Sequence, residues 1–131
     1  MKPQRVIAVD LGGTKLLAGV VDSEGVVIRR TVHPTDLSSE DVLLSQVESA
    51  IGEIVDDQAD GLGIGIPSTI DQRVGRAVSS VNIPLADVNL REHLQERFGL
   101  PVMIENDANA AALAEHRLGA GRGSRHMLML T

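Results

Sequence analysis

This sequence of 131 residues has almost no aromatic side chains: it contains no tryptophan and no tyrosine, and Phe98 is its one phenylalanine. The hydrophobic core must therefore be built from valine, isoleucine, leucine and alanine, which suits a β-rich centre flanked by helices. Stacking of bases or sugars on aromatic rings is nearly excluded as a mode of binding.

Cysteine is absent as well, so the chain forms no disulfide and no thiolate metal site, and this absence is uninformative about the cellular compartment. Basic residues are in the minority. The chain has 12 lysines and arginines against 18 aspartates and glutamates, for a net charge of -6. Binding to phosphates over a wide surface needs a basic face, so we expect no nucleic-acid partner.

Long apolar runs are missing too. The first run is ended by Asp10 after four residues, which is too short for a secretory signal, and no later run approaches the length of a membrane span. We therefore expect a cytoplasmic protein that does not bind membranes. With 43% hydrophobic residues, the chain is long enough for one domain with a proper core and too short for two.

A glycine-containing turn stands between two apolar runs near the start of the chain. Residues 10–15 read Asp-Leu-Gly-Gly-Thr-Lys, and a second apolar run begins at once after them. A dinucleotide fingerprint or a Walker A loop leads into a helix, whereas no helical spacing follows here. The pattern favours a tight hairpin whose glycines take positive φ and bring backbone N–H groups close to an anion, with Thr14 and Lys15 adding a hydroxyl and a cation.

Asp10 closes the first apolar run, so we expect it at the end of a strand that is buried on both faces. A carboxylate there is unfavourable without a partner, and a hydrated magnesium ion is a natural one. The alternative is that Asp10 only stabilises the turn, and this segment alone leaves both interpretations open.

The apolar patterns predict an ordered series of elements. Residues 5–32 read as three antiparallel strands, and a helix follows to about residue 57, with Ser38 and Asp41 resembling a capping box. A glycine-rich strand at 61–66 should pair beside the first strand, and a polar excursion without helical signal runs over 67–84.

The second half continues with a helix from Asn89, a strand at 102–104 and an alanine-rich helix that Asn106 caps and Gly119 ends. A new apolar run starts at His126. The series predicts an α/β fold of the ribonuclease H-like type: a mixed sheet with a three-strand antiparallel meander, two further parallel strands and flanking helices.

A second polar group, Glu105-Asn106-Asp107, stands where a buried strand hands over to a helix. Open α/β sheets place ligand-binding groups at such points. The plain alternative is that Asn106 and Asp107 only cap the helix. The combination with Asp10 favours a site, because both carboxylates then lie at the carboxyl ends of strands.

Four motifs carry a resemblance that covers essentially the whole chain. They are Asp-Leu-Gly-Gly-Thr-Lys at 10–15, Gly-Ile-Gly-Ile-Pro at 63–67, Glu-Asn-Asp-Ala-Asn-Ala-Ala-Ala at 105–112 and Leu-Gly-Ala-Gly-Arg-Gly at 118–123. In order and spacing they resemble the ROK family of sugar kinases and sugar-sensing repressors. The resemblance implies an actin-like ATPase fold and a glucokinase-like, ATP-dependent phosphorylation of a hexose.

The resemblance also implies roles for single residues. It assigns the ATP phosphates to Asp10, Gly12, Gly13, Thr14 and Lys15. It assigns the sugar to Ser68, Thr69, Asn82, Asn106 and Asp107. Asp107 corresponds to the general base that takes the proton of the sugar hydroxyl. Asp10 corresponds to the aspartate that binds Mg²⁺ through water. Ser68 stands where many members have glycine, which leaves the identity of the sugar open.

We expect residues 1–120 to be the N-terminal domain of such a kinase and 121–131 to be the interdomain hinge with the start of a second domain. The adenosine site and any Cys/His zinc site would lie in that missing part. The chain alone should then be inactive, and we expect a homo-oligomer. A sugar-responsive regulator of the same family is the main alternative. Such regulators carry a DNA-binding segment before the glycine turn, whereas nine residues precede Asp10 here and the chain is acidic, so we favour the kinase. A non-catalytic binding domain is a third interpretation. The choice between ATP and polyphosphate as donor stays open.

Overall fold

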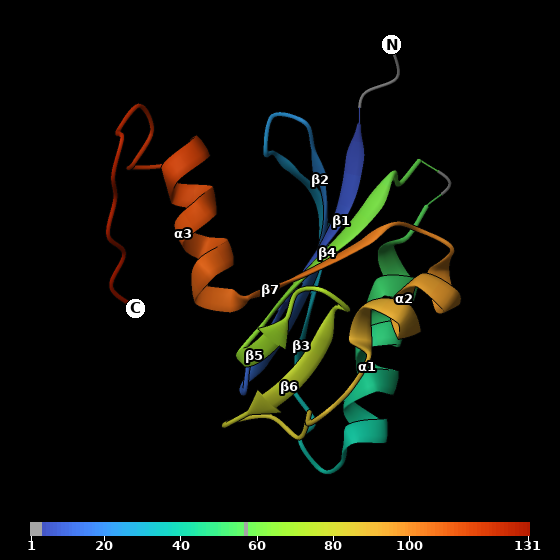
Figure 1. Ribbon diagram of the computed structural model, residues 1–131. Coiled ribbons are helices and arrows are strands. Elements are labelled where there is room, and N and C mark those ends of the chain that lie inside the picture. Colours follow the sequence, from blue (N-terminus) through green and yellow to red (C-terminus); the bar gives the residue numbers. More distant parts are fainter. Residues whose placement is uncertain (1–3, 57) are drawn as a thin grey trace.

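The computed structural model describes residues 4–56 and 58–131. The strands are β1 (Arg5–Leu11), β2 (Lys15–Asp22), β3 (Val27–Pro34), β4 (Gly61–Ile66), β5 (Ser68–Asp71), β6 (Arg76–Ser80) and β7 (Val102–Asn106). The helices are α1 (Glu40–Ile54), α2 (Leu90–Phe98) and α3 (Asp107–Leu118) (Figure 1).

Five strands form one mixed sheet in the order β3-β2-β1-β4-β7. The first three strands are antiparallel neighbours, whereas β4 and β7 run parallel to β1. The predicted mixed sheet, with its meander and its two later parallel strands, is confirmed. The polar excursion, for which no helix was predicted, forms the separate antiparallel hairpin β5–β6.

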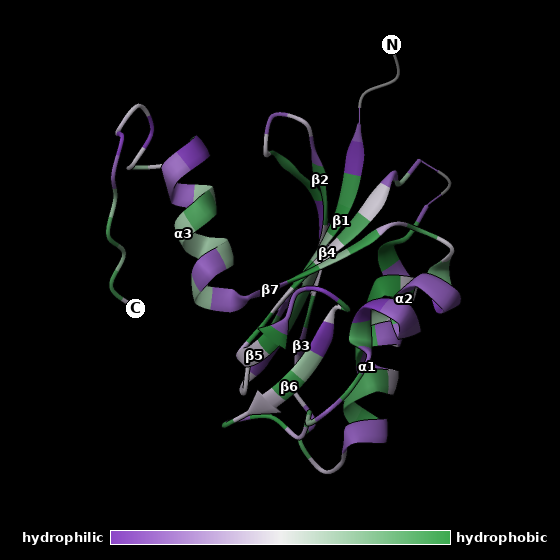
Figure 2. Cartoon of the chain, viewed as in Figure 1, coloured by the Kyte–Doolittle hydropathy of each residue, from purple (hydrophilic) through white to green (hydrophobic). Residues whose placement is uncertain are grey.

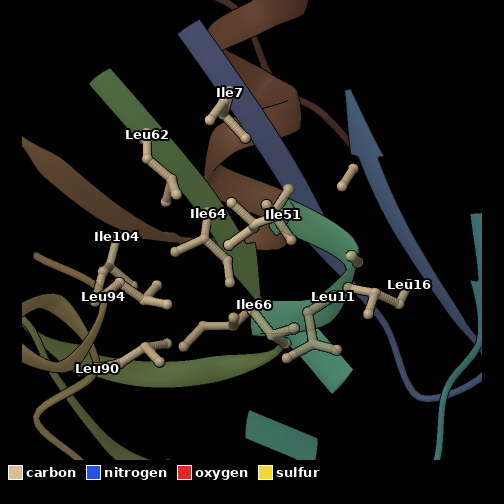
Figure 3. Packing of buried hydrophobic residues seen from close by; sticks show 14 of the residues in the cluster. Ile7, Leu11, Leu16, Ile51, Leu62, Ile64, Ile66, Leu90, Leu94 and Ile104 are labelled. Atoms are coloured by element: carbon tan, nitrogen blue, oxygen red, sulfur yellow. The ribbon is translucent and has the colours of Figure 1, made fainter. Parts of the chain in front are cut away.

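The core lies on the face of the sheet that α1 and α2 cover. Along β1 every second residue is buried, and α1 contributes Leu43, Val47 and Ile51 to the same cluster. Figure 2 shows α2 as mostly hydrophilic, and the helix buries only Leu90 and Leu94. Aliphatic side chains from the sheet and both helices meet in one cluster (Figure 3). Each fully buried leucine or isoleucine side chain contributes roughly 1.5–3 kcal/mol to such a core.

The opposite face of the sheet is open, so the expectation that β1 is buried on both faces is wrong. Val6, Ala8 and Asp10 are exposed along β1, and Met103 of β7 is 78% exposed. The helix on this side, α3, has no buried residue along its described length and stands away from the sheet (Figure 1). An apolar run of four residues cannot show whether a second layer covers it.

The helix ends are capped nearly as predicted. The N-cap of α1 is Ser39, whose side chain accepts a hydrogen bond from Val42 N, whereas Ser38 donates its hydroxyl to Asp36. The capping box predicted at Ser38 is therefore wrong by one residue. Asn89 precedes α2 without a capping bond, and Asn106 caps α3 as expected.

The apolar run that starts at His126 does not form a strand. Residues 125–131 have no strand assignment and run back along α3 (Figure 1). Among the helices of residues 4–56 and 58–131, every one is too short or too polar to cross a lipid bilayer.

Candidate active site

The two carboxylates singled out in the sequence converge at one edge of the sheet. Because β1, β4 and β7 are parallel, their carboxyl ends meet there, and Asp10 pairs in register with Gly65 of β4. A Cβ atom at residue 65 would lie 3.5 Å from the Cα atom of Asp107. Asp10, Gly65 and Asp107 accordingly line one pocket of about 490 Å³.

Asp10 is electrostatically coupled to Asp107. Desolvation by the surrounding protein raises the pKa of Asp10, and the negative charge of Asp107 raises this pKa further. Both effects disfavour the ionised carboxylate, and a cation placed between the two side chains would relieve them. No group of three or more metal-ligating side chains occurs in the described residues. Mg²⁺ keeps several water ligands and needs only one or two carboxylates, so this pair fits such an ion.

The turn at residues 12–15 exposes backbone donors. Gly12 N donates to Lys15 O at 2.9 Å and closes the hairpin. Within the chain that the structure describes, the N–H groups of Gly13 and Thr14 have no hydrogen-bond partner, and both residues are exposed. Adjacent free N–H groups beside a lysine can hold an anion.

The glycines of this turn do not have the positive φ that the sequence predicted. Positive φ among the glycines occurs at four other positions: Gly25, Gly75, Gly99 and Gly123. A Cβ atom at Gly12 would lie 3.3 Å from Lys15 O, which is a tight contact, whereas one at Gly13 would lie 3.5 Å from Asn82 O, an ordinary van der Waals distance. The turn therefore lies directly against the loop that carries Asn82.

Asn106 and Asp107 do cap α3, yet both keep polar atoms free. Asn106 Oδ1 accepts from Ala108 N and Asn109 N at 3.1 and 3.2 Å, and its Nδ2 donates to Ser68 O at 3.3 Å. Asp107 Oδ1 accepts from Ala108 N at 2.9 Å. In the described part of the chain, Asp107 Oδ2 has no protein donor, so it remains open as a proton acceptor.

Ser68 and Thr69 lie at the start of the β5–β6 hairpin, and the structure treats them differently. Ser68 is 5% exposed and its hydroxyl is hydrogen-bonded to the hydroxyl of Ser80. A ligand would therefore meet Ser68 through its backbone. Thr69 is exposed, as is Asn82 in the loop after β6.

Glu105, for which the sequence predicted no role, stabilises the start of α3. Its Oε1 accepts from Asn106 N at 2.7 Å and from Asn109 Nδ2 at 3.3 Å. The spacing of four residues between Glu105 and Asn109 was the available signal. Gln72 Nε2 adds a bond to Ile104 O at 3.1 Å and ties the β5–β6 turn to the end of β7.

Comparison with known proteins identifies relatives of this chain. The model of the ROK family matches residues 6–131. The glucokinase of Streptomyces coelicolor is 36% identical over 125 residues, covering 95% of this chain and 39% of that protein. The glucokinase of Thermotoga maritima is 37% identical over 134 residues, covering 100% of this chain and 42% of that protein.

A solved structure agrees with these relatives. The ROK family glucokinase from Streptomyces griseus, in complex with glucose and AMPPNP, superposes with a TM-score of 0.85 at 35% identity, covering 91% of this chain and 38% of that one. The actin-like ATPase fold predicted from the sequence is thereby confirmed. The chain spans about two fifths of the length of the curated relatives it matches.

Proposed function

The chain belongs to the ROK family, and from this premise we propose that it forms the N-terminal part of an ATP-dependent hexose kinase. The observation that carries the proposal is the position of Asp10 and Asp107 on either side of Gly65, beside a turn with free N–H groups. Phosphoryl transfer depends mainly on positioning and on neutralisation of phosphate charge, and this arrangement offers groups for both.

The ATP phosphates would lie at the turn of residues 12–15. The free N–H groups of Gly13 and Thr14, the Thr14 hydroxyl and the Lys15 ammonium group would hold the phosphate oxygens. Asp10 would hold Mg²⁺ through its water ligands, because the desolvated carboxylate beside Asp107 favours a cation. When bound, Mg²⁺ neutralises charge on the phosphates.

The sugar would lie against Asn106 and Asp107. Asn106 Oδ1 is already occupied by the first N–H groups of α3, so this residue can offer one Nδ2 hydrogen to a sugar oxygen. Asp107 Oδ2 would accept the proton of the attacking hydroxyl. As the hydroxyl oxygen bonds to the γ-phosphorus, the bond from that phosphorus to the bridging oxygen of ADP breaks. Thr69, Asn82 and the Ser68 backbone would complete the sugar side.

The rest of the active site would come from residues beyond this chain. In this proposal residues 1–120 form the N-terminal domain and 121–131 lead toward a second domain, which supplies the adenosine site and any zinc site. We further propose a cytoplasmic enzyme that works as a homo-oligomer. A sugar-sensing regulator of the same family is the alternative.

A panel assay of the full-length protein tests the proposal. The protein is incubated with a series of hexoses and either ATP or polyphosphate, and sugar phosphate formation is followed for each pair. We expect ATP-dependent phosphorylation of at least one hexose, well above the ATP hydrolysis seen without sugar. Sugar binding without phosphorylation by either donor would contradict the kinase and support the regulator.

A further inference from the structure

Thr35, which follows β3 directly, is hydrogen-bonded to the turn at residues 12–15. Thr35 N donates to Thr14 O at 2.9 Å, and Thr35 Oγ1 donates to Gly12 O at 2.8 Å. One residue therefore binds two carbonyl groups of the turn. Nothing in the sequence near Thr35 signals this contact, because the partners are separated by 21 and 23 positions.

These two bonds set the direction of the N–H groups in the turn. In a trans peptide the C=O and N–H bonds point in opposite directions. A carbonyl of Gly12 that points to Thr35 therefore turns the N–H of Gly13 away from Thr35. The carbonyl of Thr14 does the same for the N–H of Lys15. Within the turn, Gly13 is one of the two residues whose N–H has no partner in the described chain.

Thr35 is itself held by a side chain of α1. Gln46 Nε2 donates to Pro34 O at 2.6 Å, and Gln46 Oε1 accepts from Asp36 N at 2.9 Å. The two bonds require opposite ends of the amide group, so they also determine its orientation. Gln46 is thus hydrogen-bonded to the backbone immediately before and after Thr35.

We propose that Thr35 and Gln46 are positioning residues for the phosphate-binding turn. This inference rests on the proposed function, namely that residues 12–15 bind the ATP phosphates. Two adjacent glycines make the turn flexible, and a carbonyl oxygen rotated toward a phosphate would repel it. Gln46 holds Thr35 in place, and Thr35 keeps the Gly12 and Thr14 carbonyls directed away from the nucleotide. Neither residue has to touch the nucleotide.

Four substitutions in the full-length protein separate this role from a general effect on folding. Thr35→Val removes the hydroxyl but keeps the shape and the backbone N–H. Thr35→Ser keeps the hydroxyl. Gln46→Met removes both hydrogen bonds of the side-chain amide and keeps a side chain of similar length. The matched control is Thr31→Val in β3, where the lost hydroxyl donates to Glu53 Oε2 at 2.7 Å and not to the turn.

The KM values for ATP and for the preferred hexose are then compared, with unfolding in urea as a measure of stability. We expect Thr35→Val and Gln46→Met to raise the KM for ATP by about fivefold to tenfold, the loss typical of one or two hydrogen bonds. Their KM for the hexose should stay within about twofold of the parent, a change too small for one lost hydrogen bond. Thr35→Ser and Thr31→Val should keep the parent KM for ATP.

Equal ATP affinity in Thr35→Val and Thr31→Val would overturn the positioning role, as would equal rises in both KM values. If Thr35→Val fails to fold, Gln46→Met carries the same comparison against Thr31→Val. If the unsubstituted protein neither binds nor uses ATP, the proposed function fails, and this result differs visibly from a normal parent with an unaffected Thr35 variant.

Discussion

Asp107 lies directly beside Gly65: a Cβ atom at residue 65 would be in van der Waals contact with the Asp107 Cα atom, at 3.5 Å. Gly65 is the strand partner of Asp10, and as a glycine it places no side chain beside the two aspartates. The two carboxylates interact electrostatically at this point. The interaction has consequences that are measurable in the chain itself.

The first consequence concerns the pKa of Asp10. The charge of Asp107 is one of the two causes that raise this pKa, so Asp107→Asn should lower it. Carbon-13 NMR titration of the Asp10 carboxyl group in both proteins measures the change. Asp41→Asn, in the first turn of α1, is a control that should leave the pKa of Asp10 as it is. An unchanged pKa in Asp107→Asn would show that the two carboxylates do not interact.

The raised pKa of Asp10 also predicts how stability depends on pH. The folded state binds this proton more tightly than the unfolded chain, so the free energy of unfolding falls as pH rises from the ordinary value of 3.8 through the folded pKa. Asp10→Asn removes this loss. The variant should be more stable than the parent at pH 7, and the difference should shrink below pH 4, while ATP use by the full-length protein weakens. Urea unfolding across this pH range checks the first part, and a less stable variant at pH 7 would make Asp10 a structural residue.

Gly75 in the β5–β6 turn is a position where an added side chain should lower the stability of the chain. Its φ is +68°, and a Cβ there would lie 2.4 Å from Arg91 Cβ, while Arg91 Nη2 donates to Arg73 O at 3.1 Å. Gly75→Ala should lower the free energy of unfolding by about 2 kcal/mol or more, through strain and overpacking. Gly52→Ala is the matched control, because nothing lies within 4 Å of its Cβ position in α1, and it should stabilise the chain by up to about 1 kcal/mol. Equal effects of the two substitutions in urea unfolding would contradict this account.

The fold followed from the sequence wherever the signal was local. Alternation and runs of aliphatic residues indicated all five strands of the main sheet, and Asn106 and Gly119 marked the two ends of α3, which the structure confirms. Ser38 and Ser39 are adjacent and equally suited to capping, so the pattern could not choose between them. Whether β1 is buried on one face or two depends on a second layer, which the residues of β1 do not encode.

The candidate site was predictable in its residues more than in its geometry. Asp10 stood out because it ended an apolar run, and Asp107 because it stood where a predicted strand was followed by a helix. The glycines at 12 and 13 suggested positive φ, which neither of them has, and a Cβ atom would be tightly surrounded only at Gly12. Thr35 and Gln46 gave no signal, because their partners are brought to them only by the pairing of β2 with β3 and the packing of α1.

The chain of 131 residues on its own predicts a further result. Its open sheet face and α3 expose large apolar side chains, among them Met103 at 78%, Leu118 at 63% and Leu113 at 52%. Such patches favour self-association, and the chain lacks the second half of the proposed active site. We expect a dimer or larger assembly in sedimentation at micromolar concentration, without sugar-dependent ATP consumption. A strictly monomeric chain would contradict the association, and turnover by the pure chain would contradict the proposed two-domain site.

The most direct test of the proposed mechanism is Asp107→Asn in the full-length protein, with turnover and sugar affinity measured side by side. The amide oxygen can still accept the bond from Ala108 N, so the cap of α3 is kept while the proton acceptor is lost. We expect turnover to fall by roughly 100- to 10,000-fold, the usual effect of losing a general base, with sugar affinity nearly unchanged. Turnover close to that of the parent would show that Asp107 only caps the helix and would contradict the mechanism.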